Sequence, residues 1–175
     1  MKYIVKTSLI LLAILLSSNQ WVMSQQIPDW SRFNHLLGQW IGQGTGSPGE
    51  GRGGFTFSFD LDQKILVRKG HTEFPAANGR PASAHDDLMV VYPDFGGNPV
   101  NAIYWDNEGH TIEYSVTFTG KAVIFTSAAV EGKPVFRLSY ETIDPSTVNV
   151  KFEMADPQKP GEFKVYLEGK SVKTI

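Results

Sequence analysis

Apolar and polar residues alternate along most of the chain after residue 37. In VNVKFEM, residues 148–154, apolar side chains occupy every second position and polar side chains fall between them. The stretches 112–118 and 163–167 repeat this pattern. Because successive side chains of a strand point to opposite faces, a period of two predicts strands that bury one face.

Ten segments of this kind follow one another, separated by short connections rich in Gly, Pro, Asn and Asp. They cover residues 37–46, 53–61, 64–74, 85–93, 100–107, 110–119, 121–130, 134–143, 146–156 and 162–172. Short connections predict antiparallel pairing of consecutive strands. Ten strands in one sheet normally curl and close, because closure removes exposed edges. The sequence therefore predicts an all-β fold, a single antiparallel up-and-down β-barrel of about ten strands.

A short segment with helical spacing precedes the strands. In DWSRFNHLL, residues 29–37, Asp29 is the expected N-cap, and Trp30, Phe33 and Leu37 share one helical face. So short a helix is not stable alone and must pack on something. We expect it to close one end of the barrel.

Strand directions assign the connections to two ends of the barrel. The connections 47–51, 75–81, 107–109, 131–133 and 156–161 fall at the end away from the helix and are mostly the longer, Gly- and Pro-rich ones. The other end carries the helix and the two ends of the domain. The result is a predicted cup, a barrel closed by the helix at one end and open at the other. A barrel of this size can hold one small ligand.

The N-terminal segment has the composition of a secretory signal peptide. Lys2 and Lys6 precede an apolar run, residues 8–16, which small and polar residues follow up to Ser24. The run is about half the roughly 20 residues of a membrane-spanning helix, the alternative interpretation. We expect a cleaved signal at 1–24, a barrel domain at 25–175, no membrane insertion after cleavage, and a secreted or periplasmic protein.

Charge and cysteine content restrict the chemistry. The formal net charge is −2 and no basic cluster is present, which argues against nucleic acid as a partner. The chain has no cysteine, so disulfides and every cysteine-based metal, redox or nucleophilic site are excluded.

Four polar residues are expected to gather at the upper rim of the cup. His71 and Glu73 share one parity, and a hairpin to the next strand is expected to place Asp87 opposite His71 and His85 opposite Glu73. All four then lie on one face. His71 is also in phase with Val67, which favours the interior.

This cluster has several possible roles. His110 starts a strand at the same end, so three of the four histidines are expected on one rim. Two imidazoles and two carboxylates suit Zn²⁺ or another divalent ion, or acid–base catalysis. The metal hypothesis names His71, Glu73, His85 and Asp87. The alternative is a solvated rim in which histidines and carboxylates satisfy one another.

Aromatic residues supply a second set of candidates. Tyr114 and Tyr140 follow the apolar phase of their strands and are expected inside, where a tyrosine can stack on a ligand and hydrogen-bond it. Arg137 alternates with apolar neighbours and is expected to face outward. The candidate ligand-binding residues are Trp40, His71, His85, Tyr104, Tyr114 and Tyr140.

A short helix leading into Gly38-x-Trp40 resembles the entry of lipocalin-like (calycin) barrels. The fuller pattern, LLGQWIGQGTG, FSFDLDQKILVR, DLMVVYP, DNEGH and FRLSY, resembles a bacterial family of small exported domains of unknown function within that group. The resemblance implies a helix that plugs one end, Trp40 packed at its base, and a late basic residue covering Trp40, with Lys173 the first candidate and Lys170 the second.

Three classes of function follow from these observations. The first is an exported lipocalin-like protein that binds a small apolar or amphipathic molecule inside the barrel. The second is an enzyme, or a metal- or haem-binding protein, that uses the rim cluster, with haem suggested by similarity to nitrobindins. The third is a structural or interaction module without a ligand. No catalytic motif is recognised, and the sequence names no cofactor.

Overall fold

The computed structural model describes residues 28–43, 51–76 and 79–174. The predicted signal segment, residues 1–24, lies outside the described residues. The elements, in chain order, are η1 (Ser31–Leu36), β1 (Gly38–Gln43), β2 (Arg52–Asp60), β3 (Ile65–Phe74), β4 (Ser83–Tyr92), β5 (Asn101–Asp106), β6 (Thr111–Thr119), β7 (Ala122–Ser127), β8 (Val135–Asp144), β9 (Thr147–Ala155) and β10 (Phe163–Lys173).

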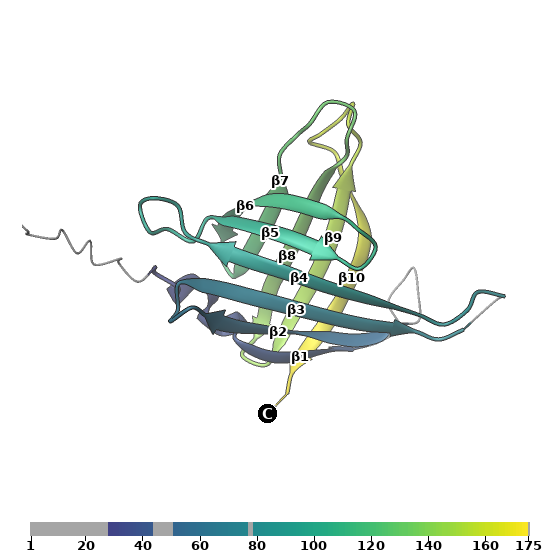
Figure 1. The fold of residues 1–175 in the computed structure, drawn as a ribbon, viewed down its shortest axis with the longest axis horizontal. Helices are drawn as coiled ribbons and strands as arrows, with labels where there is room; N and C mark the ends of the chain where they lie inside the picture. The colour runs from purple at the N-terminus through teal and green to yellow at the C-terminus, as the bar shows by residue number, and fades with distance from the viewer. Residues whose placement is uncertain (1–27, 44–50, 77–78, 175) are drawn as a thin grey trace, which may run out of the picture.

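The ten strands form one closed antiparallel barrel. Each strand pairs with its neighbours along the chain, and β1 also pairs with β10, which closes the sheet. Figure 1 shows β2–β6 crossing the front of the molecule while β8–β10 run behind them at a steep angle. Such a tilt is required when a sheet closes on itself. The predicted all-β, up-and-down barrel of ten strands is therefore confirmed.

The short element before the barrel is a 3-10 helix, which changes its buried face. Phe33 and Leu36 are its buried residues, three positions apart, as three residues per turn require. Leu37, predicted for the same helical face, is the C-cap residue instead and packs partly buried against the core. Trp30 occupies the N-cap position, while the Asp29 carboxylate accepts a hydrogen bond from the Ser31 N–H at 3.0 Å.

η1 packs against one end of the barrel, called the closed end below. The Trp30 indole donates to the carbonyl of Gln63, in the β2–β3 turn, at 2.8 Å. Phe33 meets Phe118, near the end of β6, edge to face with ring centroids 5.3 Å apart. Among the described residues, no helix is long and apolar enough to cross a membrane.

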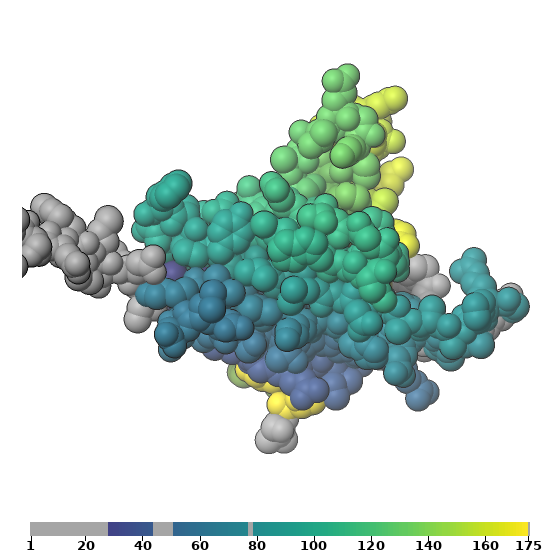
Figure 2. Space-filling view, in the orientation of Figure 1, coloured from purple at the N-terminus to yellow at the C-terminus, as the bar shows by residue number. Residues whose placement is uncertain are grey.

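The opposite end, called the open end below, carries the β3–β4, β5–β6, β7–β8 and β9–β10 connections. Three of these hairpins project beyond the body of the barrel (Figure 2): β3–β4 in blue-green, and β7–β8 and β9–β10 in green and yellow. The strand directions expected from the sequence therefore hold. At the closed end, the β4–β5 connection also projects from the body, as the teal loop at the left of Figure 1.

Trp40 lies at the base of the barrel wall and is 1% exposed. Its indole donates to the Leu36 carbonyl at 2.7 Å, its ring stacks on Phe55, and the Lys173 ammonium lies 5.3 Å from its ring centroid. The cover that the lipocalin resemblance implies for Lys173 is therefore present. Gly38 makes room for it, because a Cβ there would lie 2.9 Å from the Lys173 Cε.

The barrel interior is filled mainly by aromatic and aliphatic side chains. Phe55 and Phe57 each meet Tyr140 edge to face at 5.3 Å, and Phe125 meets the same ring at 6.1 Å. Side chains of directly paired residues share a face of the sheet, so the pairing register identifies which residues face inward. Phe57 pairs with Arg68, which places the Arg68 side chain inside the barrel.

Candidate functional site

Inward side chains near the open end remain partly exposed, unlike those deeper in the barrel. Phe136 and Phe152, on β8 and β9, are intermediate in exposure, whereas Tyr140 and Val148 lower on the same strands are fully buried. The Phe136 and Phe152 rings stack with centroids 5.8 Å apart. Tyr166, at a bulge in β10 and 55% exposed, packs edge-on against Phe152. Phe136, Phe152 and Tyr166 form the apolar wall.

A set of polar side chains lies on the strands opposite those of the apolar wall. In a closed order of ten strands, β3–β5 lie opposite β8–β10. Arg68, His85, Asp87 and Tyr104, on β3, β4 and β5, form the polar wall, and all four share the inward face. The open end therefore presents aromatic carbon on one side and hydrogen-bonding groups on the other.

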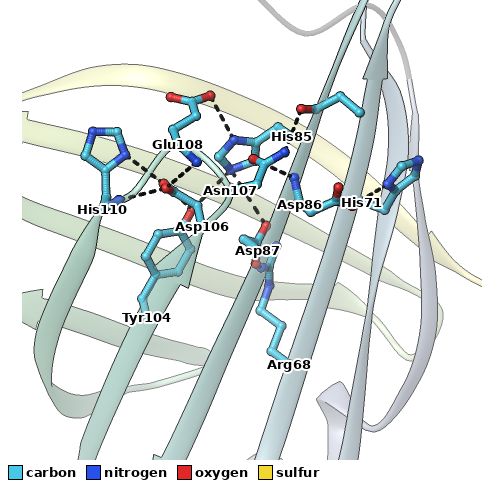
Figure 3. A network of polar contacts seen from close by, with 11 residues as sticks. Arg68, His71, His85, Asp86, Asp87, Tyr104, Asp106, Asn107, Glu108 and His110 are labelled. Atoms are coloured by element: carbon cyan, nitrogen blue, oxygen red, sulfur yellow. Dashed lines mark hydrogen bonds and ion pairs between the residues drawn. The ribbon is translucent and has the colours of Figure 1, made fainter.

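Arg68 and Asp87 form an ion pair within the polar wall (Figure 3). Their side chains are 11% and 9% exposed. The Arg68 guanidinium also lies 5.1 Å from the ring centroid of Phe55. Gly70, which pairs directly with Asp87, leaves the space the pair needs, since a Cβ at residue 70 would collide with the Asp87 carboxylate.

His85 links this ion pair to the rim. Its Nε2 lies 3.1 Å from the Tyr104 hydroxyl and 4.0 Å from Oδ2 of Asp87, while its Nδ1 lies 3.1 Å from Oε1 of Glu108. The Tyr104 hydroxyl donates to Asp106 at 3.3 Å. Figure 3 shows these contacts continuing from the strand interior to the β5–β6 turn.

Asp106 organises that turn. Its carboxylate accepts hydrogen bonds from the backbone N–H groups of Glu108 and His110, and its Oδ2 lies 2.8 Å from Nδ1 of His110. Burial opposes ionisation of Asp106, but the His110 and Glu108 hydrogen bonds and the nearby His110 charge outweigh burial and lower the pKa. Asp106 is therefore an anion at neutral pH.

The inward tyrosines stay protonated at neutral pH. Burial raises the pKa of Tyr104, Tyr114 and Tyr140 above the usual value, so each hydroxyl is a neutral donor and acceptor. Within the described residues, the Tyr140 hydroxyl and Nε of Arg68 are buried without a hydrogen-bond partner. Such groups are rare in folded proteins, because each gives up its hydration without a replacement.

The predicted pairing of β3 with β4 is wrong by one residue. His71 pairs with Asp86 rather than Asp87, and Glu73 pairs with Ala84 rather than His85. The register was inferred across a connection of several residues, which does not fix it as a tight hairpin turn does. A slip of one residue moves every side chain of one strand to the opposite face.

The four predicted rim residues therefore lie on two faces of the sheet. His85 and Asp87 face inward, whereas His71 and Glu73 face outward, where the imidazole Nδ1 lies 2.6 Å from Oδ1 of Asp86. The expectation that His71 faces the interior is wrong, because the inward phase of β3 is that of Leu66 and Arg68. Within the described ranges, no three His, Asp or Glu residues are placed to hold a metal ion together.

The other predicted ligand-binding residues occupy different depths. Tyr104 belongs to the polar wall and remains partly exposed. Tyr114 and Tyr140 face inward, as their phase predicts, and are 4% and 0% exposed. Trp40 is buried at the closed end, and Phe55 lies between its ring and the Arg68 guanidinium. Of the six candidates, His85 and Tyr104 lie at the open end and inside the barrel.

Arg137 faces outward, as predicted, but it is not simply solvated. Its guanidinium donates two hydrogen bonds to Glu153, at 2.7 and 2.9 Å, and its central carbon lies 3.8 Å from the ring centroid of Phe163. A carboxylate therefore pairs with this arginine on the outer face of the barrel.

Several site residues are absent from the candidates predicted from the sequence. Arg68 is one, although Gly70, two positions later on the same face, is a signal that a large polar group needs room nearby. Asp106 is another, although Asp followed by Asn-Glu-Gly is a turn sequence in which the carboxylate caps backbone N–H groups. Phe136 and Phe152 are also among them.

No protein-family model matches the sequence, and no curated protein is similar to it. The site's chemistry is therefore argued from its own geometry.

Proposed function

We propose that this protein is a lipocalin-like binding protein that takes a small amphipathic molecule into the open end of its barrel. The observation that supports the proposal is the pair of unlike walls. The apolar body of the ligand lies on Phe136, Phe152 and Tyr166, and its polar group meets Arg68, His85 and Tyr104. Pockets for small molecules commonly combine an apolar lining with a few placed polar groups.

The polar wall suits a ligand group that accepts hydrogen bonds. Tyr104 is a neutral hydroxyl, and Arg68 retains a buried N–H without a partner among the described residues. A ligand oxygen near this wall accepts the hydrogen bond for which the Arg68 N–H has no partner within the protein. The apolar wall contributes affinity in proportion to the aromatic area that the ligand removes from water.

A neutral fluorescent probe tests the apolar part of this proposal. N-phenyl-1-naphthylamine increases in fluorescence when it leaves water, and we expect saturable binding to the purified barrel. The Phe152→Ala variant should bind the probe about tenfold more weakly, since it removes much of one aromatic contact surface. The matched control is Val165→Ala, which truncates an exposed residue of β10 paired with the outward Glu153.

Two results would contradict the proposal. One is an absence of saturable fluorescence with wild type, and the other is equal affinity of wild type and Phe152→Ala while Val165→Ala also binds normally. Thermal unfolding of each variant shows whether the barrel is intact. Native mass spectrometry of the protein from its own source then identifies any molecule that co-purifies.

The metal and acid–base hypotheses rested on four groups converging on one face. Because His71 and Glu73 lie on the outer face, that convergence is lost, and the contacts of His85 are satisfied by Glu108 and Tyr104. The interaction-module hypothesis lacks a partner argued from the structure. Amphipathic ligand binding is the function we propose.

We also propose that the protein is exported and that residues 1–24 are removed. The basic residues, apolar run and small residues at the start of the chain support this. Intact-mass measurement of the protein from its own source should give a chain that begins near Gln25. A chain that retains Met1 in the membrane fraction would instead identify an anchor.

A further inference from the structure

The closed end of the barrel has a pocket that the proposed function does not use. It has a volume of about 320 Å³ and lies between η1 and the adjoining ends of β6, β7 and β8. Its lining residues are Ser31, Arg32, His35, Phe118, Gly120, Lys121, Ala122, Val123 and Thr142. This cationic pocket is remote from the two walls, because it lies at the other end of the barrel.

The charged side chains that line this pocket have one sign. Arg32 and Lys121 are cations, and no Asp or Glu belongs to the lining. Among residues that the structure describes, neither cation has a carboxylate within ion-pair distance. The Asp29 carboxylate, which accepts a hydrogen bond from the Ser31 N–H, interacts electrostatically with Arg32 but does not line the pocket. Two unpaired cations beside one hollow favour an anion there.

The pocket also has an apolar floor and uncharged hydrogen-bonding groups. The guanidinium of Arg32 lies 4.7 Å from the ring centroid of Phe118, which holds its planar face against carbon. Ala122 and Val123 continue this apolar surface, whereas Ser31 and Thr142 add hydroxyls. The buried Nε2 of His35 has no hydrogen-bond partner among the described residues. An inorganic ion alone would leave the apolar surface uncovered.

His35 adds no positive charge at neutral pH. Burial lowers the pKa of its imidazole, and the charge of Lys173 lowers it further. The ring is therefore neutral and has one nitrogen that accepts and one that donates. The charge available to an anion comes from Arg32 and Lys121, and Lys173 adds a further positive charge near His35.

We propose that this pocket binds a small organic carboxylate whose apolar part lies on Phe118, Ala122 and Val123. The carboxylate lies between the Arg32 guanidinium, whose planar fork matches two oxygens, and the Lys121 ammonium. The hydroxyls of Ser31 and Thr142 border the site. The volume admits a ligand of about the size of benzoate rather than a long-chain lipid.

Benzoate and its uncharged analogue benzamide test this proposal directly. We expect wild type to bind benzoate at least about tenfold more tightly than benzamide, with amide chemical-shift changes centred on Gly120 and Lys121. Arg32→Gln and Lys121→Gln should each weaken benzoate binding about tenfold and leave benzamide unchanged. Lys133→Gln, an exposed lysine in the β7–β8 connection at the open end, is the matched control.

Each other outcome overturns the proposal. Equal affinity for benzoate and benzamide would show that the ligand's charge does not contribute to binding. Inorganic phosphate binding as tightly as benzoate would show that the apolar surface does not contribute. Amide chemical-shift changes confined to Tyr104 and Phe152 would show that benzoate binds at the open end instead. Benzoate binding does not depend on the neutral probe, so loss of one leaves the other proposal standing.

Discussion

The two ends of this barrel are built differently, although the same ten strands form both. At the closed end, large aromatic groups are fully buried and their polar atoms have partners, as Trp40 shows with the Leu36 carbonyl and Trp30 with the Gln63 carbonyl. At the open end, Phe136, Phe152 and Tyr104 remain partly exposed. The Trp40 region of the closed end is packed like an ordinary protein core. At the open end, aromatic surface that a core would bury remains accessible to solvent.

This difference assigns stability mainly to the core around Trp40 at the closed end, and the proposed amphipathic ligand to the open end. The buried aromatic core around Trp40 gains the area-dependent free energy of burial, about 25 cal/mol per Å² of apolar surface. An end that keeps aromatic rings exposed and leaves buried donors without partners is less stable than it could be. Lower local stability of this kind is typical of functional sites.

The largest expected effect is at the closed end, from Trp40→Ala. Removing a fully buried tryptophan leaves a cavity against Phe55 and deprives the Leu36 carbonyl of its donor. The free energy of unfolding should fall by about 3–5 kcal/mol, measured by chemical denaturation. Trp40→Phe should cost clearly less, because most of the cavity stays filled. A loss below about 1 kcal/mol for Trp40→Ala would mean that this end is not the stable one.

The next effect concerns the ion pair of the polar wall. Arg68→Met leaves the Asp87 carboxylate nearly buried without its cation, and should lower the free energy of unfolding by about 3 kcal/mol. The double variant Arg68→Met, Asp87→Leu should recover much of that loss, since it removes both charges. A double variant as unstable as the single one would show that packing, rather than charge, sets the cost.

A pair of tyrosine variants compares satisfied and unsatisfied hydroxyls. Tyr104→Phe removes a hydroxyl that contacts His85 and Asp106, and should destabilise the protein by about 1 kcal/mol. Tyr140→Phe removes a buried hydroxyl without a partner, and should stabilise it by up to about 1 kcal/mol. Denaturation curves of the two variants measure this directly. Equal destabilisation by both would mean that the Tyr140 hydroxyl is hydrogen-bonded in solution.

The smallest effect is on the outer face, at His71. Hydrogen bonds that the exposed imidazole donates, to Asp86 first and to Glu73 second, raise its pKa. A raised pKa means that the stabilisation is present below the unfolded-state value near 6.5 and is lost as the pH rises through the folded-state value. An NMR titration should give a His71 pKa above 6.5, and Asp86→Asn should lower it. An unchanged pKa in Asp86→Asn would show that the contact is not maintained in solution.

Much of the architecture was predictable because strand periodicity and turn residues are local signals. The alternation in residues 148–154 fixed which side chains of β9 face inward, and the Gly, Pro and Asp connections fixed the number and direction of the strands. Trp40 and its cover by Lys173 came from a resemblance to known barrels. The helix type was missed, since spacings of three and of 3.6 residues differ little over six positions.

The polar wall could be predicted only in part. His85 and Tyr104 were named, but the register between β3 and β4 depends on how a connection of several residues closes, and a single-residue error moved His71 to the wrong face. Only the strand pairing shows that Arg68 meets Asp87 inside the barrel and that Gly70 leaves space for the two side chains. The cationic pocket joins Arg32 of η1 to Lys121 after β6, two residues that no local pattern connects.

The chain alone determined its secondary structure, strand order and closure, because these follow from short-range periodicity and from the need to pair every strand edge. Tertiary structure decided which polar groups meet, because that depends on pairing register and on contacts between distant segments. A shift of one residue leaves the hydrophobic alternation looking the same in the sequence, yet it exchanges the inside and outside of a strand.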